Sequence, residues 1–115
     1  MKGHHSPEGR AIRTLSRGLN GWSSGGLSRR DVAVLCDQAM HDWLHARLRR
    51  SPWSFPTLPA LLPQARKEGW ITPADEIQLR EVQGLRARAD AEATITAAEV
   101  EAVLEFCIQL VEKHW

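Results

Sequence analysis

Hydrophobic residues recur every three or four positions in several segments of the chain, which is the spacing of one face of an α-helix. The clearest pattern follows Thr96, and a second one follows Ser28 and ends before Ser51-Pro52. Both segments therefore predict amphipathic helices that bury one face in a core. Their apolar positions are Val32, Leu35, Cys36, Ala39, Met40, Trp43, Leu44 and Leu48 in the earlier segment, and Val100, Val103, Leu104, Cys107, Leu110 and Val111 in the later one.

Three capping boxes mark where helices should begin. In such a box a Ser or Thr side chain accepts a hydrogen bond from the backbone N–H three residues later, and an acidic side chain at that position bonds back. Helix starts are therefore expected near residues 29, 73 and 97, the second being strengthened by a first-turn proline, Pro73. The pairs are Ser28 with Asp31, Thr72 with Asp75, and Thr96 with Glu99.

The remaining segments complete an all-α prediction. The helix after Thr72 should continue to about Asp90, burying Ile77, Leu79, Val82 and Leu85. A short helix is expected over residues 59–67, with Gly69 suited to cap its end, and an N-terminal helix over residues 7–22, followed by a loop at 23–26. Short connections favour antiparallel neighbours. We expect an antiparallel up-and-down four-helix bundle with an additional N-terminal helix.

Composition agrees with a helical domain. The 115 residues suit a single domain, with a core over residues 28–113 and a disordered tail at 1–6. The chain has no Tyr and two Phe, and 25% of its residues are charged. Residues 1–50 carry a net charge of +5 and residues 51–115 one of −4, counted without His. This asymmetry would suit packing within the bundle, self-association or a charged partner.

Cysteine usage and the absence of long apolar runs predict a cytoplasmic protein. Cys36 and Cys107 both lie on apolar stripes, so two buried thiols are expected rather than a disulfide. The N-terminal residues lack the apolar stretch of a signal peptide. No segment approaches the roughly 18 apolar residues that a membrane-spanning helix needs. No cofactor is expected.

One helical face carries a metal-like spacing of side chains. Asp37, His41 and His45 follow one another at intervals of four, and such ligands can share a transition metal. The same face would equally serve as a solvated polar surface, which is the commoner arrangement. The sequence shows no phosphate-binding loop, no Gly-x-Ser-x-Gly motif and no dinucleotide fingerprint.

Clustered arginines and tryptophans offer RNA or protein contacts. Guanidinium groups bind phosphate and aromatic rings stack on bases, although basic residues near helix ends also complement the helix dipole. Tryptophans at helix ends could instead cover the core or enter a protein interface. The candidate phosphate-binding residues are Arg47, Arg49, Arg50, Arg80, Arg86 and Arg88, and the candidate interface residues are Trp53, Trp70 and Trp115.

The stretch Asp31–Lys113 resembles the HEPN superfamily of helical nucleotide-binding domains. The resemblance lies in the order of its segments: DVAVLCDQAMHDWLHARLRR, then TLPALLPQARKEGWIT, then LRARADAEATIT, then AAEVEAVLEFCIQLVEK. HEPN domains commonly finish their third helix with Leu-Arg-Asn-x-x-x-His before an Ile-Thr turn and a last helix. The resemblance implies a helical bundle that pairs with a second copy.

In active HEPN members this Arg and His meet across a two-fold interface and cut RNA. The resemblance places Arg86 at the Arg position, but Ala87 replaces Asn and Ala91 stands where His belongs. Alanine cannot transfer a proton, which is the role that an imidazole would fill. The resemblance thus implies a degenerate site around Arg86, Asp90 and Ala91. The tyrosine that some toxin members carry after the motif is absent as well.

Three functions follow. The first is a non-catalytic HEPN-like module, a homodimer or the partner of a protein such as a nucleotidyltransferase, in a bacterial defence, toxin–antitoxin or RNA-associated system. The second is a protein that binds or cleaves RNA with its arginine clusters and His41 or His45. The third is a small helical adaptor of unrelated ancestry that binds protein through its tryptophans.

Overall fold

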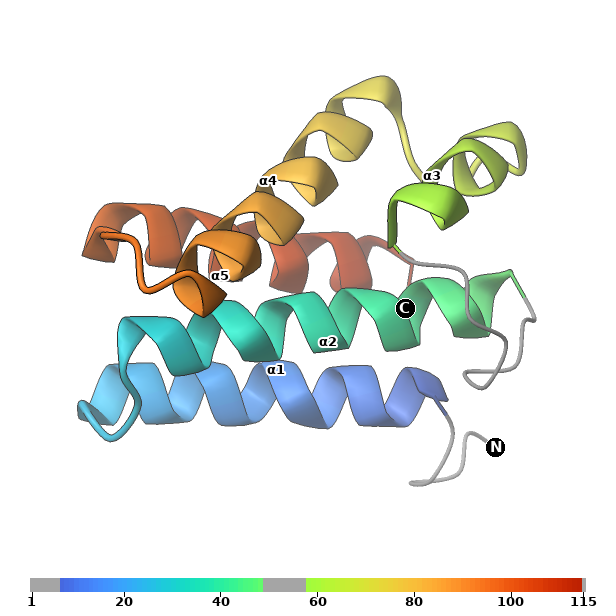
Figure 1. Cartoon of the computed structure of the whole chain (residues 1–115). Helices are drawn as coiled ribbons and strands as arrows, with labels where there is room; N and C mark the ends of the chain where they lie inside the picture. Colours follow the sequence, from blue (N-terminus) through green and yellow to red (C-terminus); the bar gives the residue numbers. More distant parts are fainter. Residues whose placement is uncertain (1–6, 49–57, 115) are drawn as a thin grey trace.

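The computed structural model describes residues 7–48 and 58–114, and these residues form five helices (Figure 1). No strand occurs within these two ranges, so the all-α prediction is confirmed. None of the five helices is both long and apolar enough to cross a membrane. The helices are α1 (Pro7–Ser24), α2 (Arg29–Arg47), α3 (Leu58–Lys67), α4 (Pro73–Asp90) and α5 (Ala97–Lys113).

The three predicted capping boxes are confirmed at the starts of α2, α4 and α5. At α4, the Asp75 backbone N–H donates to Thr72 Oγ1 at 3.1 Å, and the Thr72 N–H donates to an Asp75 carboxylate oxygen at 2.9 Å. These bonds satisfy N–H groups that have no partner inside the helix. Local sequence therefore determines three of the five helix starts.

Three helices end with the same backbone arrangement. Past the end of α3, Gly69 has a φ of 82° and the Trp70 N–H donates to the Ala65 carbonyl, as in a Schellman motif. Gly25 occupies the matching left-handed position after α1, which extends two residues beyond its predicted end. After α4 the position is taken by Glu92, with a φ of 56°. The predicted cap at Gly69 is confirmed.

Helix α2 lies at the centre of the molecule and contacts each of the other four helices (Figure 1). α1 runs along α2 and also contacts α5, whereas the short α3 contacts only α2 and α4. In Figure 1 α4 runs obliquely to α1 and α2. The N-terminal helix is thus packed against the central helix rather than standing apart from it, and α2 is the element through which the others are connected.

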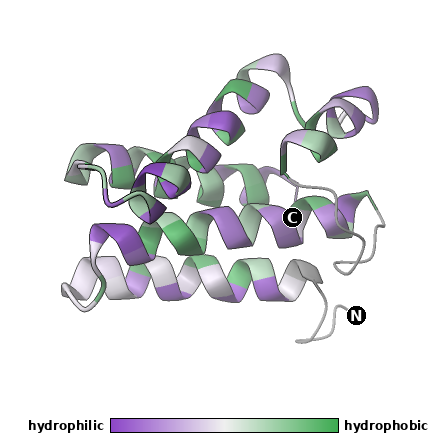
Figure 2. Cartoon of the chain, viewed as in Figure 1, coloured by the Kyte–Doolittle hydropathy of each residue, from purple (hydrophilic) through white to green (hydrophobic). Residues whose placement is uncertain are grey.

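The core is built from the predicted apolar stripes. Met40, Trp43 and Leu44 of α2 are fully buried, and Figure 2 shows hydrophobic and hydrophilic residues interleaved along α2 and α5 as amphipathic helices require. Cys36 and Cys107 are both buried free thiols, as predicted. Burial, followed by the neighbouring Cys36 thiol, raises the pKa of Cys107. These thiols therefore serve as packing groups.

Ile77 is a correction to the predicted core. It is 60% exposed, although the sequence pattern placed it with the inward residues of α4. Ile77 precedes the buried Leu79 by two residues, which is about 200° around a helix, so the two side chains lie on opposite faces. Ala89 completes the buried face instead, together with Val82 and Leu85.

Candidate functional site

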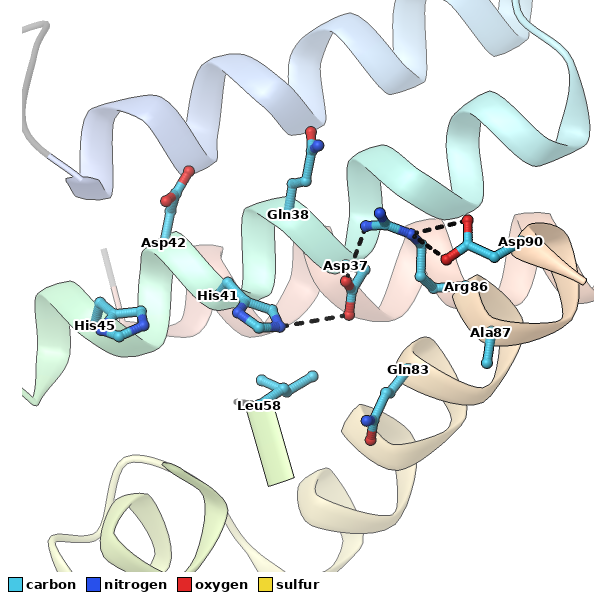
Figure 3. A pocket seen from close by; sticks show the side chains of 10 residues that line it. All are labelled: Asp37, Gln38, His41, Asp42, His45, Leu58, Gln83, Arg86, Ala87 and Asp90. Atoms are coloured by element: carbon cyan, nitrogen blue, oxygen red, sulfur yellow. Dashed lines mark hydrogen bonds and ion pairs between the residues drawn. The ribbon is translucent and has the colours of Figure 1, made fainter. Parts of the chain in front are cut away.

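A pocket of about 710 Å³ opens between α2 and α4, next to the first residue of α3 (Figure 3). Its walls combine carboxylate, imidazole, amide and guanidinium groups with few apolar ones. Five of the titratable side chains singled out in the sequence, those of Asp37, His41, His45, Arg86 and Asp90, therefore meet at one place. The lining residues are Asp37, Gln38, His41, Asp42, His45, Leu58, Gln83, Arg86, Ala87 and Asp90.

Helical spacing explains why these residues share a wall. In α2, Asp37, His41 and His45 are separated by four residues each and so lie one above another along one face. In α4, Arg86 and Asp90 are related in the same way. Because α2 and α4 pack against each other, the two polar faces come together across the pocket.

Arg86 links the two helices at the centre of this pocket. Its Nη1 donates to Asp37 Oδ2 at 3.1 Å, and its Nε donates to the Asp90 carboxylate at 3.2 and 3.4 Å. The Arg86 side chain is 30% exposed, compared with 54% for Asp90 and 11% for Asp37. The guanidinium is therefore shared between a buried carboxylate and an exposed one (Figure 3).

Asp37 is the most deeply placed carboxylate. Its Oδ1 lies 3.8 Å from His41 Nε2, and that oxygen has no hydrogen-bond partner among the described residues. Burial raises the pKa of Asp37 even though His41 and Arg86 lower it. Burial also raises the pKa of Asp42, on the same wall. The pocket thus holds two carboxyl groups that take up protons more readily than they would in water.

The predicted metal trio lies together in this pocket, but not as a metal-binding group. Asp37 and His45 are buried and His41 is half-buried. Within residues 7–48 and 58–114, no cluster of three or more His, Cys, Asp or Glu side chains is arranged to hold a metal ion.

The structure divides the three residues that the HEPN resemblance groups together, Arg86, Asp90 and Ala91. Arg86 and Asp90 line the pocket, whereas the exposed Ala91 is the C-terminal capping residue of α4, with its N–H donating to the Ala87 carbonyl at 3.0 Å. The Ala91 methyl group therefore stands at the end of α4, at the position where the resemblance implies an imidazole. In this pocket the imidazole of His41, on α2, lies beside Asp37, the carboxylate that Arg86 bonds.

The predicted phosphate-binding arginines that can be located are engaged within the chain. Arg47 donates to the His114 carbonyl at 2.8 Å, and Arg80 pairs with Glu76 at 3.6 Å. Arg88 bonds both carboxylate oxygens of Glu99 and the carbonyl oxygen of Thr94. Arg49 and Arg50 lie outside the described residues. These arginines stabilise helix ends and helix contacts in the free protein.

Of the three candidate interface tryptophans, one lies within the described residues. Trp70 is half-buried and packs against the Arg47 guanidinium, 5.1 Å from its ring centroid, and edge-on against His114. Trp70 therefore covers the end of the core where α2 and α5 terminate. Trp53 and Trp115 lie outside the residues that the structure describes.

Sequence reasoning missed the pairing at the heart of the pocket. Asp37 and Arg86 are 49 residues apart and were assigned to two different candidate sites. Asp42, Gln38 and Gln83 were not singled out, since a polar residue on a helix surface carries no distinguishing pattern. The polar residues one turn apart, Asp37, His41 and His45 on α2 and Arg86 and Asp90 on α4, do not indicate that the two helix faces meet.

No protein-family model, curated protein or solved structure matches this chain. Its class is therefore given by its own structure: an all-α protein of five described helices, with four of them packed on a central one. Its distinguishing site is the pocket around Arg86.

Proposed function

We propose that this chain is a non-catalytic HEPN-like helical module that acts by binding. It would serve as a dimerising or partner-binding subunit of a bacterial defence, toxin–antitoxin or RNA-associated system in the cytoplasm. The observation that carries the proposal is the state of Arg86, whose guanidinium is already neutralised by Asp37 and Asp90. A guanidinium held in this way contributes a link between helices rather than a free phosphate-binding group.

The chemistry of the neighbouring position supports the same conclusion. General acid–base cleavage of RNA needs a group that exchanges protons near neutral pH within reach of the scissile bond. Alanine at position 91 supplies none. Asp37 and Asp90 both bond Arg86, and Asp42 lines the same pocket, so the acidic groups outnumber the one arginine and would repel a phosphate backbone.

The pairing surface in this proposal follows the family resemblance. We place it on α4 and α5 around Arg86 and the exposed Asp90, within an up-and-down bundle of the HEPN kind. A second copy, or a protein such as a nucleotidyltransferase, would cover this surface. Asp90, at 54% exposure, is accessible for such a contact.

Two measurements test the proposal. Light scattering of the full chain should give the mass of a dimer, or of a complex once a partner is added. Incubation of the protein with labelled RNA in the presence of a chelator should leave the RNA intact, with Arg86→Ala indistinguishable from the wild type. RNA cleavage that disappears in Arg86→Ala would show that the chain is a nuclease and refute the proposal.

A second candidate function has one observation in its favour. His41 and Arg86 converge on the same carboxylate, Asp37, in a pocket open to solvent. If RNA displaced Asp90 from Arg86, His41 could act as the base and Arg86 could hold the phosphate. Cleavage lost in both His41→Ala and Arg86→Ala, with a gel shift that weakens steeply as salt rises, would establish this function.

A further inference from the structure

Helices α1 and α5 leave an apolar groove between them, away from the Arg86 pocket. Two adjoining cavities of about 370 and 440 Å³ form it, and they share Leu19, Ile108 and Glu112. The floor is therefore continuous along both helices. It is lined by Ile12, Leu15, Leu19 and Trp22 of α1, and by Leu104, Ile108 and Val111 of α5.

The packing of α1 explains why a groove remains. Where the two helices meet, a Cβ added at Gly18 would stand 3.7 Å from a methyl group of Leu104, an ordinary packing distance, so α1 lies against α5 at this position. Leu19 lies one turn after the buried Leu15 on the same side of α1, yet it remains 44% exposed. An exposed leucine beside other apolar groups extends the hydrophobic surface beyond what a solvated helix needs.

The length of the groove fits a short helix. Ile12 and Trp22 are ten residues apart on α1, and Glu101 and Glu112 are eleven apart on α5, which corresponds to about 15 Å in each case. About three turns of a partner helix span this distance, enough for anchors at positions i, i+4 and i+7. The groove is too long to be explained as the site of one side chain.

The charge of the residues that line the groove indicates which kind of partner could bind there. Glu101, Glu105 and Glu112 of α5 line the groove, and no Lys or Arg of the part of the chain that the structure describes lines either of its two cavities. A second copy docked here by a two-fold axis would bring the two sets of glutamates together, which is unfavourable. An anionic membrane surface would be repelled as well. A segment with basic residues beside its apolar face is complementary.

We propose that this groove binds an amphipathic helix of a partner protein, with its apolar face on α1 and α5 and its Lys or Arg residues against the three glutamates. The inference rests on the proposal that the chain acts by binding, and it names the kind of partner. The groove shares no lining residue with the Arg86 pocket.

A pair of synthetic peptides tests the charge requirement. Each is a fluorescein-labelled helix of about 14 residues with leucines at i, i+4, i+7 and i+11, flanked by lysines in one peptide and glutamates in the other. With the full chain, fluorescence anisotropy should show binding of the lysine peptide and at least about tenfold weaker binding of the glutamate peptide. Equal affinity for both peptides, or no binding of the lysine peptide, would overturn the proposal.

Matched variants locate the binding. Leu19→Asp and the double variant Glu101→Lys with Glu105→Lys should each weaken binding of the lysine peptide by about tenfold or more. Ile77→Asp and Glu81→Lys make the same changes at exposed positions of α4, outside the groove, and should leave the affinity unchanged. All are surface positions, and circular dichroism checks that each variant is folded.

The other possible outcomes of these experiments also test the proposal. Peptide binding that survives Leu19→Asp would place the site elsewhere and overturn the proposal. Self-association that Leu19→Asp abolishes, without peptide binding to the wild type, would assign the groove to a second copy. RNA cleavage dependent on Arg86 would refute the proposed function while leaving the peptide result valid, so the two failures are distinguishable.

Discussion

Glu92 occupies a backbone position that glycine usually fills. Its φ of 56° lies in the left-handed region, where a Cβ crowds the following carbonyl, and it follows α4 as Gly69 follows α3. We expect Glu92→Gly to stabilise the protein by about 0.5–1 kcal/mol, because relief of strain exceeds the added flexibility of the unfolded chain. The midpoint of urea unfolding measures the change. Gly69→Ala should shift that midpoint the opposite way, and a destabilised Glu92→Gly protein would contradict the argument.

Glycines inside helices provide a second test at the same scale. Gly84 is exposed in α4, and a Cβ added there would meet nothing within 4 Å. Alanine is favoured over glycine within helices by about 1 kcal/mol, so Gly84→Ala should raise the free energy of unfolding by that amount. At Gly21 the added carbon would stand 2.4 Å from Leu27, and Gly21→Ala should destabilise the fold. Thermal unfolding of both variants measures the two changes in stability. If both variants were more stable than the wild type, helix propensity alone would determine the effect, and the contact with Leu27 would not matter.

The carboxylate of Glu99 links the end of α4 to the start of α5 through its bonds to Arg88 and to the Thr96 backbone. Hydrogen bonds from Arg88, and then from the Thr96 backbone, lower the pKa of Glu99 from 4.5 to about 2. Since the folded state favours the charged form, this stabilisation is complete above pH 4.5 and is lost as the pH falls towards 2. Glu99→Gln should remove that part of the pH dependence, measured as urea midpoints across this range. Glu81→Gln, at an exposed position of α4, should retain the wild-type slope. If it flattened the curve equally, the effect would not belong to the junction.

Elements were more predictable than their arrangement. Capping boxes, glycine caps and hydrophobic period act over a few residues, so the helix starts after Ser28, Thr72 and Thr96 could be found from the sequence. Ile77 shows the limit of that method, because an isolated apolar residue does not reveal which side of its helix it occupies. The packing of α1 along α2 had no local signal, since both helices carry similar apolar stripes.

At the scale of the whole molecule, the site was recognised only in parts. Asp37 and His41 were identified by spacing on one helix, and Arg86 and Asp90 by a family resemblance on another, but nothing in the sequence indicated that they adjoin. Their meeting depends on how α4 lies against α2, which is fixed by packing between residues distant in the chain. The α1–α5 groove was missed for the same reason. Local patterns locate chemical groups, and tertiary packing decides which of them share a pocket.

Arg47 is a candidate RNA-binding residue by sequence, but in the structure it connects the ends of two helices. Its Nη2 donates to the His114 carbonyl at 2.8 Å, and its guanidinium lies 5.1 and 5.9 Å from the ring centroids of Trp70 and Trp43. The end of α2, the segment before α4 and the end of α5 are thereby joined. Lysine keeps the charge but lacks the planar group that can bond and stack at once.

We therefore expect Arg47→Lys to lower the free energy of unfolding by about 1–2 kcal/mol, since a charged hydrogen bond and two ring contacts are weakened together. Arg80→Lys is the matched control: its ion pair with Glu76 is 54% exposed on the arginine side, and the change should cost less than about 0.5 kcal/mol. Urea unfolding of the two variants gives both values. If Arg47→Lys were as stable as Arg80→Lys, the contacts at this end would not hold the helices together, and Arg47 would be available for a ligand.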